Sequence, residues 1–100
     1  MKRATVHTPE HEELVLLLHD LRLEAGLTQA EAAAALGRPQ TYVSAVEVGR
    51  RGVDLVQIRE FCGIYGLTFP VFAQRYEDYL SRRESKRRPP RGGRKAARSA

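Results

Sequence analysis

Three histidines and one cysteine are the residues whose side chains could hold a metal ion or act as a nucleophile. His7 and His11 lie four residues apart, a spacing that zinc ligands on one helix use. His7 nevertheless precedes the first predicted helix, and His19 lies two turns beyond His11, so we expect the histidines to be surface residues. Cys62 lies in an apolar stretch without a basic partner for its thiol. Since the serine-elbow and phosphate-loop patterns are also missing from the sequence, we expect no catalytic residue, no metal and no cofactor.

A short polar stretch flanked by arginines offers another chemistry, which is hydrogen bonding to nucleic acid. Gln40 can form two hydrogen bonds with the edge of adenine, and Thr41 and Ser44 can each donate or accept one. The arginines around this stretch are Arg38, Arg50 and Arg51. Such cations hold phosphates and fix the register of a protein on DNA without reading its sequence. The pattern therefore favours recognition over catalysis.

Five helices are predicted to position these side chains, and their starts carry capping signals. Thr8 caps the first helix. Thr28 and Glu31 form a capping box before the second helix, and Asp54 with Gln57 forms an acidic cap before the fourth. The predicted helices cover residues 9–25, 29–36, 39–48, 55–65 and 68–81. No stretch alternates as a strand would, so we expect an all-α domain.

The second and third predicted helices are joined by a tight turn, as in a helix-turn-helix unit. Within residues 29–48, Ala33 is small where the two helices cross, and Gly37 permits a left-handed turn. Val43 and Val46 anchor the second of these helices to the core. In such a unit the second helix is presented to the major groove of DNA.

The residues on either side of this unit extend the pattern. They read Leu21-Arg22, Gly26-Leu27-Thr28-Gln29 and Glu47-Val48-Gly49-Arg50-Arg51. With these flanks, residues 14–67 resemble the lambda-repressor/Cro-like helix-turn-helix family, also called the XRE family. The resemblance implies a five-helix, lambda-repressor-like DNA-binding domain.

The resemblance also implies roles for individual residues. Contacts with base edges fall on Gln40, Thr41, Ser44 and Ala45. Phosphate contacts fall on Gln29, Arg38, Arg50 and Arg51, and a structural ion pair falls on Arg22 and Glu47. Two residues depart from the family pattern, because Pro39 replaces a capping Ser or Thr and Ala45 replaces a long polar residue. Few direct base contacts are therefore expected, and recognition is expected to rely more on Arg38, on DNA shape and on the basic segment after residue 81.

The net charge of +5 is distributed unevenly over 100 residues, a length that suits one domain. Residues 82–100 carry nine basic residues and one acid, whereas residues 1–81 are net acidic at −3. Since the basic segment has no large apolar residue, we expect it to be a disordered tail. The predicted organisation is an arm at 1–8, a helix-turn-helix domain at 9–81 and the tail at 82–100. Tail residues expected to contact DNA are Arg87, Arg88, Arg91, Arg94 and Lys95.

Together these features predict a sequence-specific transcriptional regulator, a repressor that binds a palindromic operator in double-stranded DNA as a homodimer. We expect the fifth helix to pack on the first and to expose aromatic side chains for the dimer. The dimerisation candidates are Leu16, Leu23, Phe69, Phe72, Tyr76 and Tyr79. The alternative is an antitoxin-like or other protein-interaction role in which the tail binds a partner protein, and RNA is a further candidate ligand of the tail. Short apolar runs and the lone cysteine predict a cytoplasmic location without membrane contact.

Overall fold

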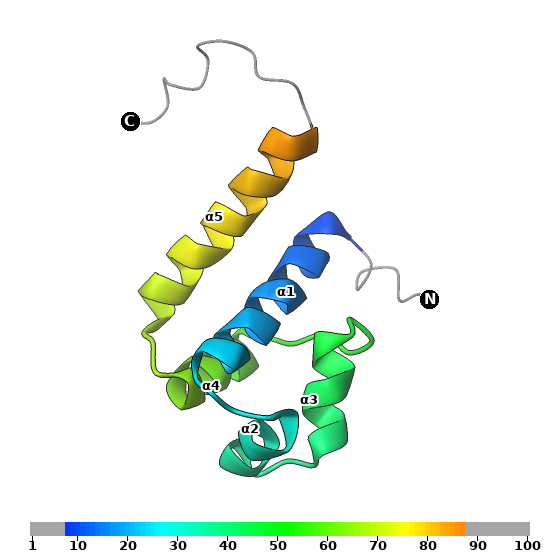
Figure 1. Cartoon of the computed structure of the whole chain (residues 1–100), viewed down its shortest axis with the longest axis vertical. Helices are drawn as coiled ribbons and strands as arrows, with labels where there is room; N and C mark the ends of the chain where they lie inside the picture. The colour runs from blue at the N-terminus through cyan, green and yellow to red at the C-terminus, as the bar shows by residue number, and fades with distance from the viewer. Residues whose placement is uncertain (1–7, 88–100) are drawn as a thin grey trace.

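The computed structural model describes residues 8–87, with side chains through residue 85, and contains five α-helices in chain order (Figure 1). They are α1 (Pro9–Glu24), α2 (Gln29–Leu36), α3 (Gln40–Glu47), α4 (Leu55–Tyr65) and α5 (Phe69–Arg87). No strand occurs within the described range, which confirms the predicted all-α class. Residues 1–7 of the predicted arm and the tail residues Arg88, Arg91, Arg94 and Lys95 lie outside the described residues, as does the Arg87 side chain.

The starts of the helices follow the capping signals in the sequence. The Thr28 hydroxyl accepts from the backbone N–H of Glu31 at 3.0 Å, while the Glu31 carboxylate accepts from the N–H of Thr28 at 2.9 Å. Asp54 and Gln57 exchange the same two bonds at the start of α4. Pro39 caps α3 without any side-chain hydrogen bond, as its replacement of Ser or Thr predicts.

The core forms where α1, α2, α3 and α4 meet. Ala33 is 1% exposed, so α2 and α3 approach each other closely at this small residue. Val43 and Val46 are fully buried and fix α3 against the rest of the domain. Gly37 ends α2 with a φ of 71°, which supplies the left-handed turn between the two helices. These four predictions are confirmed, and together they determine which face of α3 points outward.

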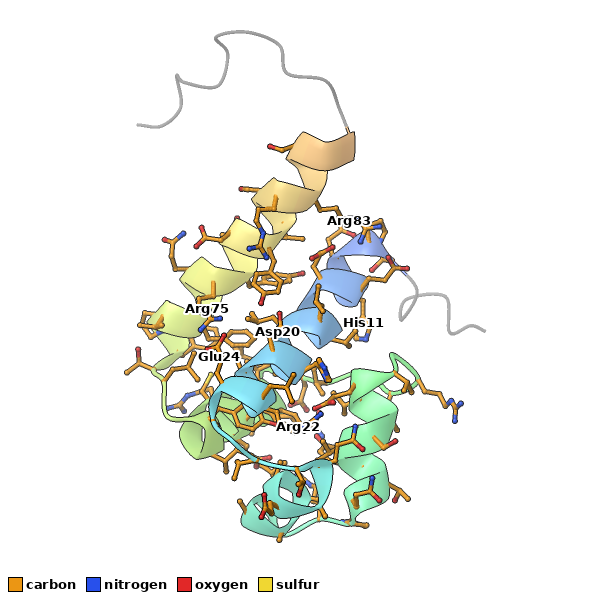
Figure 2. All side chains as sticks on the ribbon, viewed as in Figure 1. His11, Asp20, Arg22, Glu24, Arg75 and Arg83 are labelled. Carbon is orange, nitrogen blue, oxygen red and sulfur yellow. The ribbon has the colours of Figure 1, made fainter. Side chains whose placement is uncertain are left out.

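Helix α5 lies alongside α1 and runs in the opposite direction (Figures 1 and 2). Near the start of α5, Arg75 donates two hydrogen bonds of 2.8 and 2.6 Å to Glu24, the last residue of α1. Toward the other end, a guanidinium nitrogen of Arg83 lies 3.0 Å from the carboxylates of both Glu12 and Glu13. The predicted packing of the fifth helix on the first is therefore confirmed.

The aromatic side chains of α5 face inward, which corrects part of the dimerisation prediction. Phe72 and Tyr79 are only 4% and 7% exposed, and the Tyr79 hydroxyl donates to Asp20 on α1. Phe69 and Tyr76 are partly buried against the core, and the Tyr76 hydroxyl donates to the carbonyl of Glu10. As dimerisation candidates Phe72 and Tyr79 are wrong, because packing of α5 on α1 already buries them.

The predicted boundary between domain and tail also needs correction. Helix α5 continues six residues beyond Ser81 and ends at Arg87, so residues 82–87 are helical rather than disordered. The ion pairs of Arg83 with α1 explain the extension, because they stabilise a turn that the local sequence leaves without apolar support. The guanidinium of Arg82 also lies 4.4 Å from the ring centroid of Tyr79.

Candidate nucleic-acid interface

Helix α3 presents a polar row to solvent along the side opposite its core contacts. Gln40 and Thr41 are exposed, and Ser44 and Ala45, one turn later, are partly exposed. The buried side of the helix is formed by Tyr42, Val43 and Val46. The structure thus brings the four predicted base-contacting residues together on the outward face of one helix.

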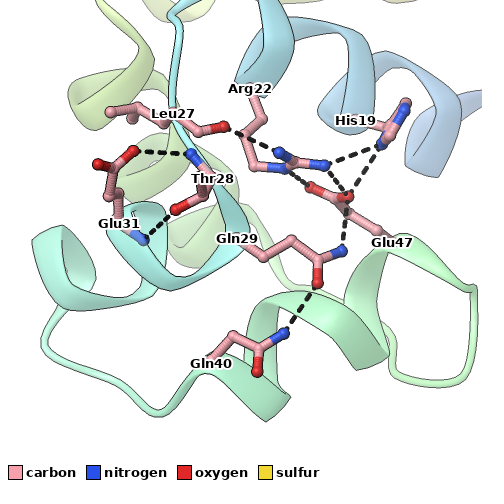
Figure 3. A network of polar contacts seen from close by, with 8 residues as sticks. All are labelled: His19, Arg22, Leu27, Thr28, Gln29, Glu31, Gln40 and Glu47. Atoms are coloured by element: carbon pink, nitrogen blue, oxygen red, sulfur yellow. Dashed lines mark hydrogen bonds and ion pairs between the residues drawn. The ribbon is translucent and has the colours of Figure 1, made fainter.

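Gln40 does not stand alone at the start of this row (Figure 3). Its side-chain amide donates a hydrogen bond of 2.9 Å to Oε1 of Gln29, the first residue of α2. Nε2 of Gln29 in turn donates to Oε1 of Glu47, 3.1 Å away, at the end of α3. Gln29, predicted to contact a phosphate, therefore also orients the amide of the residue predicted to contact a base.

Glu47 and Arg22 form the predicted ion pair beneath this glutamine pair. Nε of Arg22 donates to Oε2 of Glu47 at 2.7 Å and Nη2 donates to Oε1 at 3.0 Å, while Nη1 donates to the carbonyl of Leu27 at 2.8 Å. The side chains of Arg22 and Glu47 are only 9% and 5% exposed. This pair links α1, the turn before α2, and the end of α3, and so fixes the position of α3.

The electrostatics of this cluster favour the ionised carboxylate. Burial by itself raises the pKa of Glu47, but hydrogen bonds from Arg22, His19 and Gln29 outweigh it and hold the pKa below its ordinary value. The hydrogen bond to Glu47 likewise raises the pKa of Arg22. Both members of the pair are therefore charged at neutral pH.

His19 also belongs to this cluster. Its Nδ1 lies 3.0 Å from Oε1 of Glu47 and 3.3 Å from Nη2 of Arg22. Its side chain is 42% exposed, which agrees with the predicted surface location, and its contact with the ion pair is an additional finding. The spacing of three residues between His19 and Arg22 on one helix is the signal that could have revealed the contact.

The three flanking arginines lie in different surroundings. Arg38 donates a hydrogen bond of 2.8 Å to Glu60 on α4, which raises the pKa of Arg38. The guanidinium carbons of Arg38 and Arg51 lie 4.7 and 5.0 Å from the centroid of the Tyr42 ring. Arg50 is exposed. The arginines can be identified from the sequence, but the role of Tyr42 cannot, because a buried aromatic residue on α3 is typical of core packing.

No other kind of site emerges from residues 8–87. They contain no group of three or more His, Cys, Asp or Glu side chains that could hold a metal ion. Cys62 is buried, and burial raises the pKa of its thiol, which disfavours the reactive thiolate. No helix in that range is long and apolar enough to cross a membrane.

Comparison with known proteins agrees with this geometry. The model of a family described as "Helix-turn-helix domain" matches residues 13–74. The crystal structure of the restriction-modification controller protein C.Esp1396I, a tetramer in complex with its natural 35 base-pair operator, has a similar fold, with a TM-score of 0.69. The match covers 74% of this chain and 97% of that chain at 19% sequence identity, so it shows the shared lambda-repressor-like fold and not the roles of single residues. No curated protein matches this sequence significantly.

Proposed function

Since this chain belongs to the helix-turn-helix domain family of DNA-binding regulators, we propose that it is a sequence-specific repressor that places α3 in the major groove of an operator. The observation that carries this proposal is the outward row of α3, whose first residue is held by Gln29 before DNA is present. Holding a base-reading side chain in place lowers the entropy that is lost on binding. A bound repressor then excludes other proteins from the groove that it fills.

Direct reading in this proposal depends on the first turn of α3. The amide of Gln40 bonds to the edge of an adenine, and its bond to Gln29 selects the orientation of that amide. Thr41 and Ser44 donate or accept one further hydrogen bond each, and Ala45 contacts a thymine methyl group. The row is short and ends in a small residue, so DNA shape contributes to the choice of operator.

Phosphate contacts surround this row in the proposal. Nε2 of Gln29 uses one hydrogen on Glu47, which leaves the second for a phosphate beside the positive end of α2. Arg38 and Arg51 contact phosphates on the two sides of α3, and Arg50 adds a third cation. These contacts set affinity and register, whereas the outward row sets sequence preference.

We further propose that two copies bind a palindromic operator as a homodimer. Leu16 and Leu23 on α1 are 46% and 55% exposed, so burial does not exclude them from the dimer contact. We nevertheless assign the contact to three more exposed apolar residues around the connection between α3 and α4. These are Val48 at 64%, Leu55 at 61% and Val56 at 67%. A two-fold contact beside the end of α3 keeps both reading helices on one side of the dimer. The tetrameric assembly of C.Esp1396I on its operator supports self-association in a protein of this fold.

Genome-wide footprinting tests the proposed function. Wild type is expected to give discrete peaks, and Gln40→Ala is expected to lose them while keeping a weak background from phosphate contacts. Gln74→Ala is the matched control, because Gln74 is an exposed glutamine on α5 whose hydrogen bond among the described residues goes to Asp78 within its own helix. Peaks that survive Gln40→Ala unchanged would exclude α3 as the reading element.

Light scattering at micromolar concentration tests the dimer. Leu55→Lys is expected to give a monomer, because a charge at the two-fold contact would be buried against its own copy. Leu23→Lys is the matched control on α1 and is expected to leave the dimer intact. The opposite result would move the contact to α1, and a monomeric wild type would refute the dimer.

A further inference from the structure

We propose that Tyr42 is a positioning residue for DNA binding, whose ring is a shared support for the two arginines on either side of the reading helix. The proposal rests on the proposed function, since it concerns how phosphate contacts are prepared. Arg38 precedes α3 and Arg51 follows it, yet their guanidinium carbons lie 4.7 and 5.0 Å from the centroid of one ring. Both distances are within the range of cation–π attraction.

The ring itself is fixed by the core. Tyr42 is 8% exposed and stacks on Phe61 of α4, with 6.1 Å between ring centroids and 8° between ring planes. Phe61 is 1% exposed and stacks in turn on Tyr65 at 5.8 Å. Burial raises the pKa of the Tyr42 hydroxyl, while the nearby Arg38 and Arg51 oppose that rise. The hydroxyl forms no hydrogen bond of ordinary geometry among the described residues, so we assign the interaction to the ring face.

The two positive charges beside the Tyr42 ring are balanced by only one carboxylate among residues 8–85. Two guanidinium groups beside one ring repel each other, and only Arg38 has a carboxylate partner, Glu60 at 2.8 Å. Within residues 8–85, Arg51 has no ion-pair partner. A backbone phosphate supplies the missing charge, and the guanidinium group is suited to it because its donors form a rigid planar fork.

A common support has a consequence for binding. Arginine side chains have many rotamers, so contact with a fixed ring reduces the entropy lost when they bind phosphate. Because the same ring serves both ends of α3, removal of the ring weakens two phosphate contacts together. The two contacts set the register of α3 in the groove, so Tyr42 influences base reading without touching a base.

Tyr42→Leu, Tyr42→Phe and Phe72→Leu form the first experiment, with DNA affinity measured against salt concentration. Tyr42→Leu is expected to weaken binding on the order of tenfold and to lower the log-log salt slope by up to about 1.8, because each phosphate contact that is lost completely removes about 0.9. Tyr42→Phe is expected to behave as wild type. Phe72→Leu removes a ring of similar burial on α5, far from the arginines in sequence, and is expected to lose stability without a change in slope.

Arg38→Lys with Arg51→Lys provides a second experiment that leaves the core intact. Lysine keeps the charge but lacks the planar group that stacks on a ring, so this double variant is expected to lose affinity as Tyr42→Leu does. Arg59→Lys is the matched control, since Arg59 is an exposed arginine of α4 that neither stacks on the ring nor belongs to the proposed phosphate contacts. An equal loss with Arg59→Lys would overturn the proposal, as would a loss with Tyr42→Phe.

NMR of the arginine side chains separates this proposal from the proposed function, because it needs no DNA. In wild type the Nε–Hε and Cδ resonances of Arg38 and Arg51 are expected to carry ring-current shifts, which Tyr42→Phe keeps and Tyr42→Leu removes. Shifts without any specific DNA binding would refute the proposed function while the support stands. Folded Tyr42→Leu protein with unchanged arginine resonances would refute the support itself.

Discussion

Gln40 donates a hydrogen bond of 2.9 Å to Gln29, so the first residue of α3 is joined directly to the first residue of α2. The bond holds the two side chains next to each other although they lie eleven positions apart in the chain. Gln29 also bonds to Glu47, which is held by Arg22. The exposed side chain of Gln40 is thereby connected to the buried ion pair through the side-chain amide of Gln29.

Removal of either glutamine is expected to weaken operator binding, and removal of both is expected to cost less than the sum. Gln29→Ala leaves the amide of Gln40 free to rotate. Gln40→Ala removes the proposed contact with the base. Since both changes disrupt one linked contact, a double-mutant cycle should give a coupling of about 0.5–3 kcal/mol. Titration of labelled operator DNA measures it, and additive losses would show that the bond has no part in recognition.

Arg22→Met is expected to destabilise the fold by about 3 kcal/mol, because it leaves the Glu47 carboxylate buried without its cation. Urea denaturation followed by circular dichroism measures the change. The double variant Arg22→Met with Glu47→Met is expected to recover much of the loss, since apolar residues of similar volume can replace a buried pair. A double variant that is less stable than either single variant would contradict this account.

Stability is expected to fall in acid partly through Glu47. Its folded-state pKa is lower than in the unfolded chain, so the ionised group contributes stability that is fully present above the ordinary pKa of about 4.3 and is lost as pH falls through the folded-state pKa. Glu47→Gln should therefore flatten the dependence of unfolding free energy on pH below about 4.3. Denaturation curves between neutral and acid pH test this. Glu77→Gln serves as the control, because Glu77 is exposed and lies outside the cluster. An equally flattened pH dependence in Glu77→Gln would show that the effect does not come from Glu47.

Gly63→Ala is expected to stabilise the protein by about 0.5–1 kcal/mol, since alanine is the better helix former. Gly63 lies inside α4, and a Cβ built there meets nothing within 4 Å. Gly37→Ala provides the contrast, because the φ of 71° at Gly37 is strained for alanine and should make the variant less stable. Thermal melting measures both, and a destabilised Gly63→Ala would reveal a close neighbour at that position in solution.

Truncation after Arg87 tests the basic tail more cleanly than truncation after Ser81. Truncation after Ser81 also removes Arg83, whose ion pairs with Glu12 and Glu13 hold α5 on α1. Loss of residues 88–100 alone is expected to weaken binding to all DNA sequences and to reduce the salt slope by about 0.9 per lost phosphate contact. An unchanged slope would show that these residues do not contact DNA.

Local signals explain why the helices could be predicted from the sequence. The capping boxes at Thr28 and Asp54 and the C-cap at Gly37 depend on residues a few positions apart, so the local sequence is enough to predict these helix ends. The identity of the polar row on α3 followed from the same logic, because Val43 and Val46 mark its buried side.

Contacts between distant residues could not be predicted in this way. The extension of α5 depends on Arg83 meeting Glu12 and Glu13, about 70 residues earlier, and no local propensity encodes that meeting. The burial of Tyr79 and the contact of His19 with Glu47 have the same origin. Side-chain spacing shows which residues share a face, but only the packed fold shows what that face meets.

The antiparallel packing of α5 on α1 has a consequence for synthesis of the chain. Helices α2 and α3 contact each other across a short turn and can pair as soon as both have left the ribosome. The side of α1 that carries Asp20 and Glu24 stays open until residues 69–87 emerge, because its partners Tyr79 and Arg75 lie there. The domain therefore closes last at the helix that was made first, and a chain interrupted before α5 leaves this side of α1 uncovered and available for aggregation or for a chaperone.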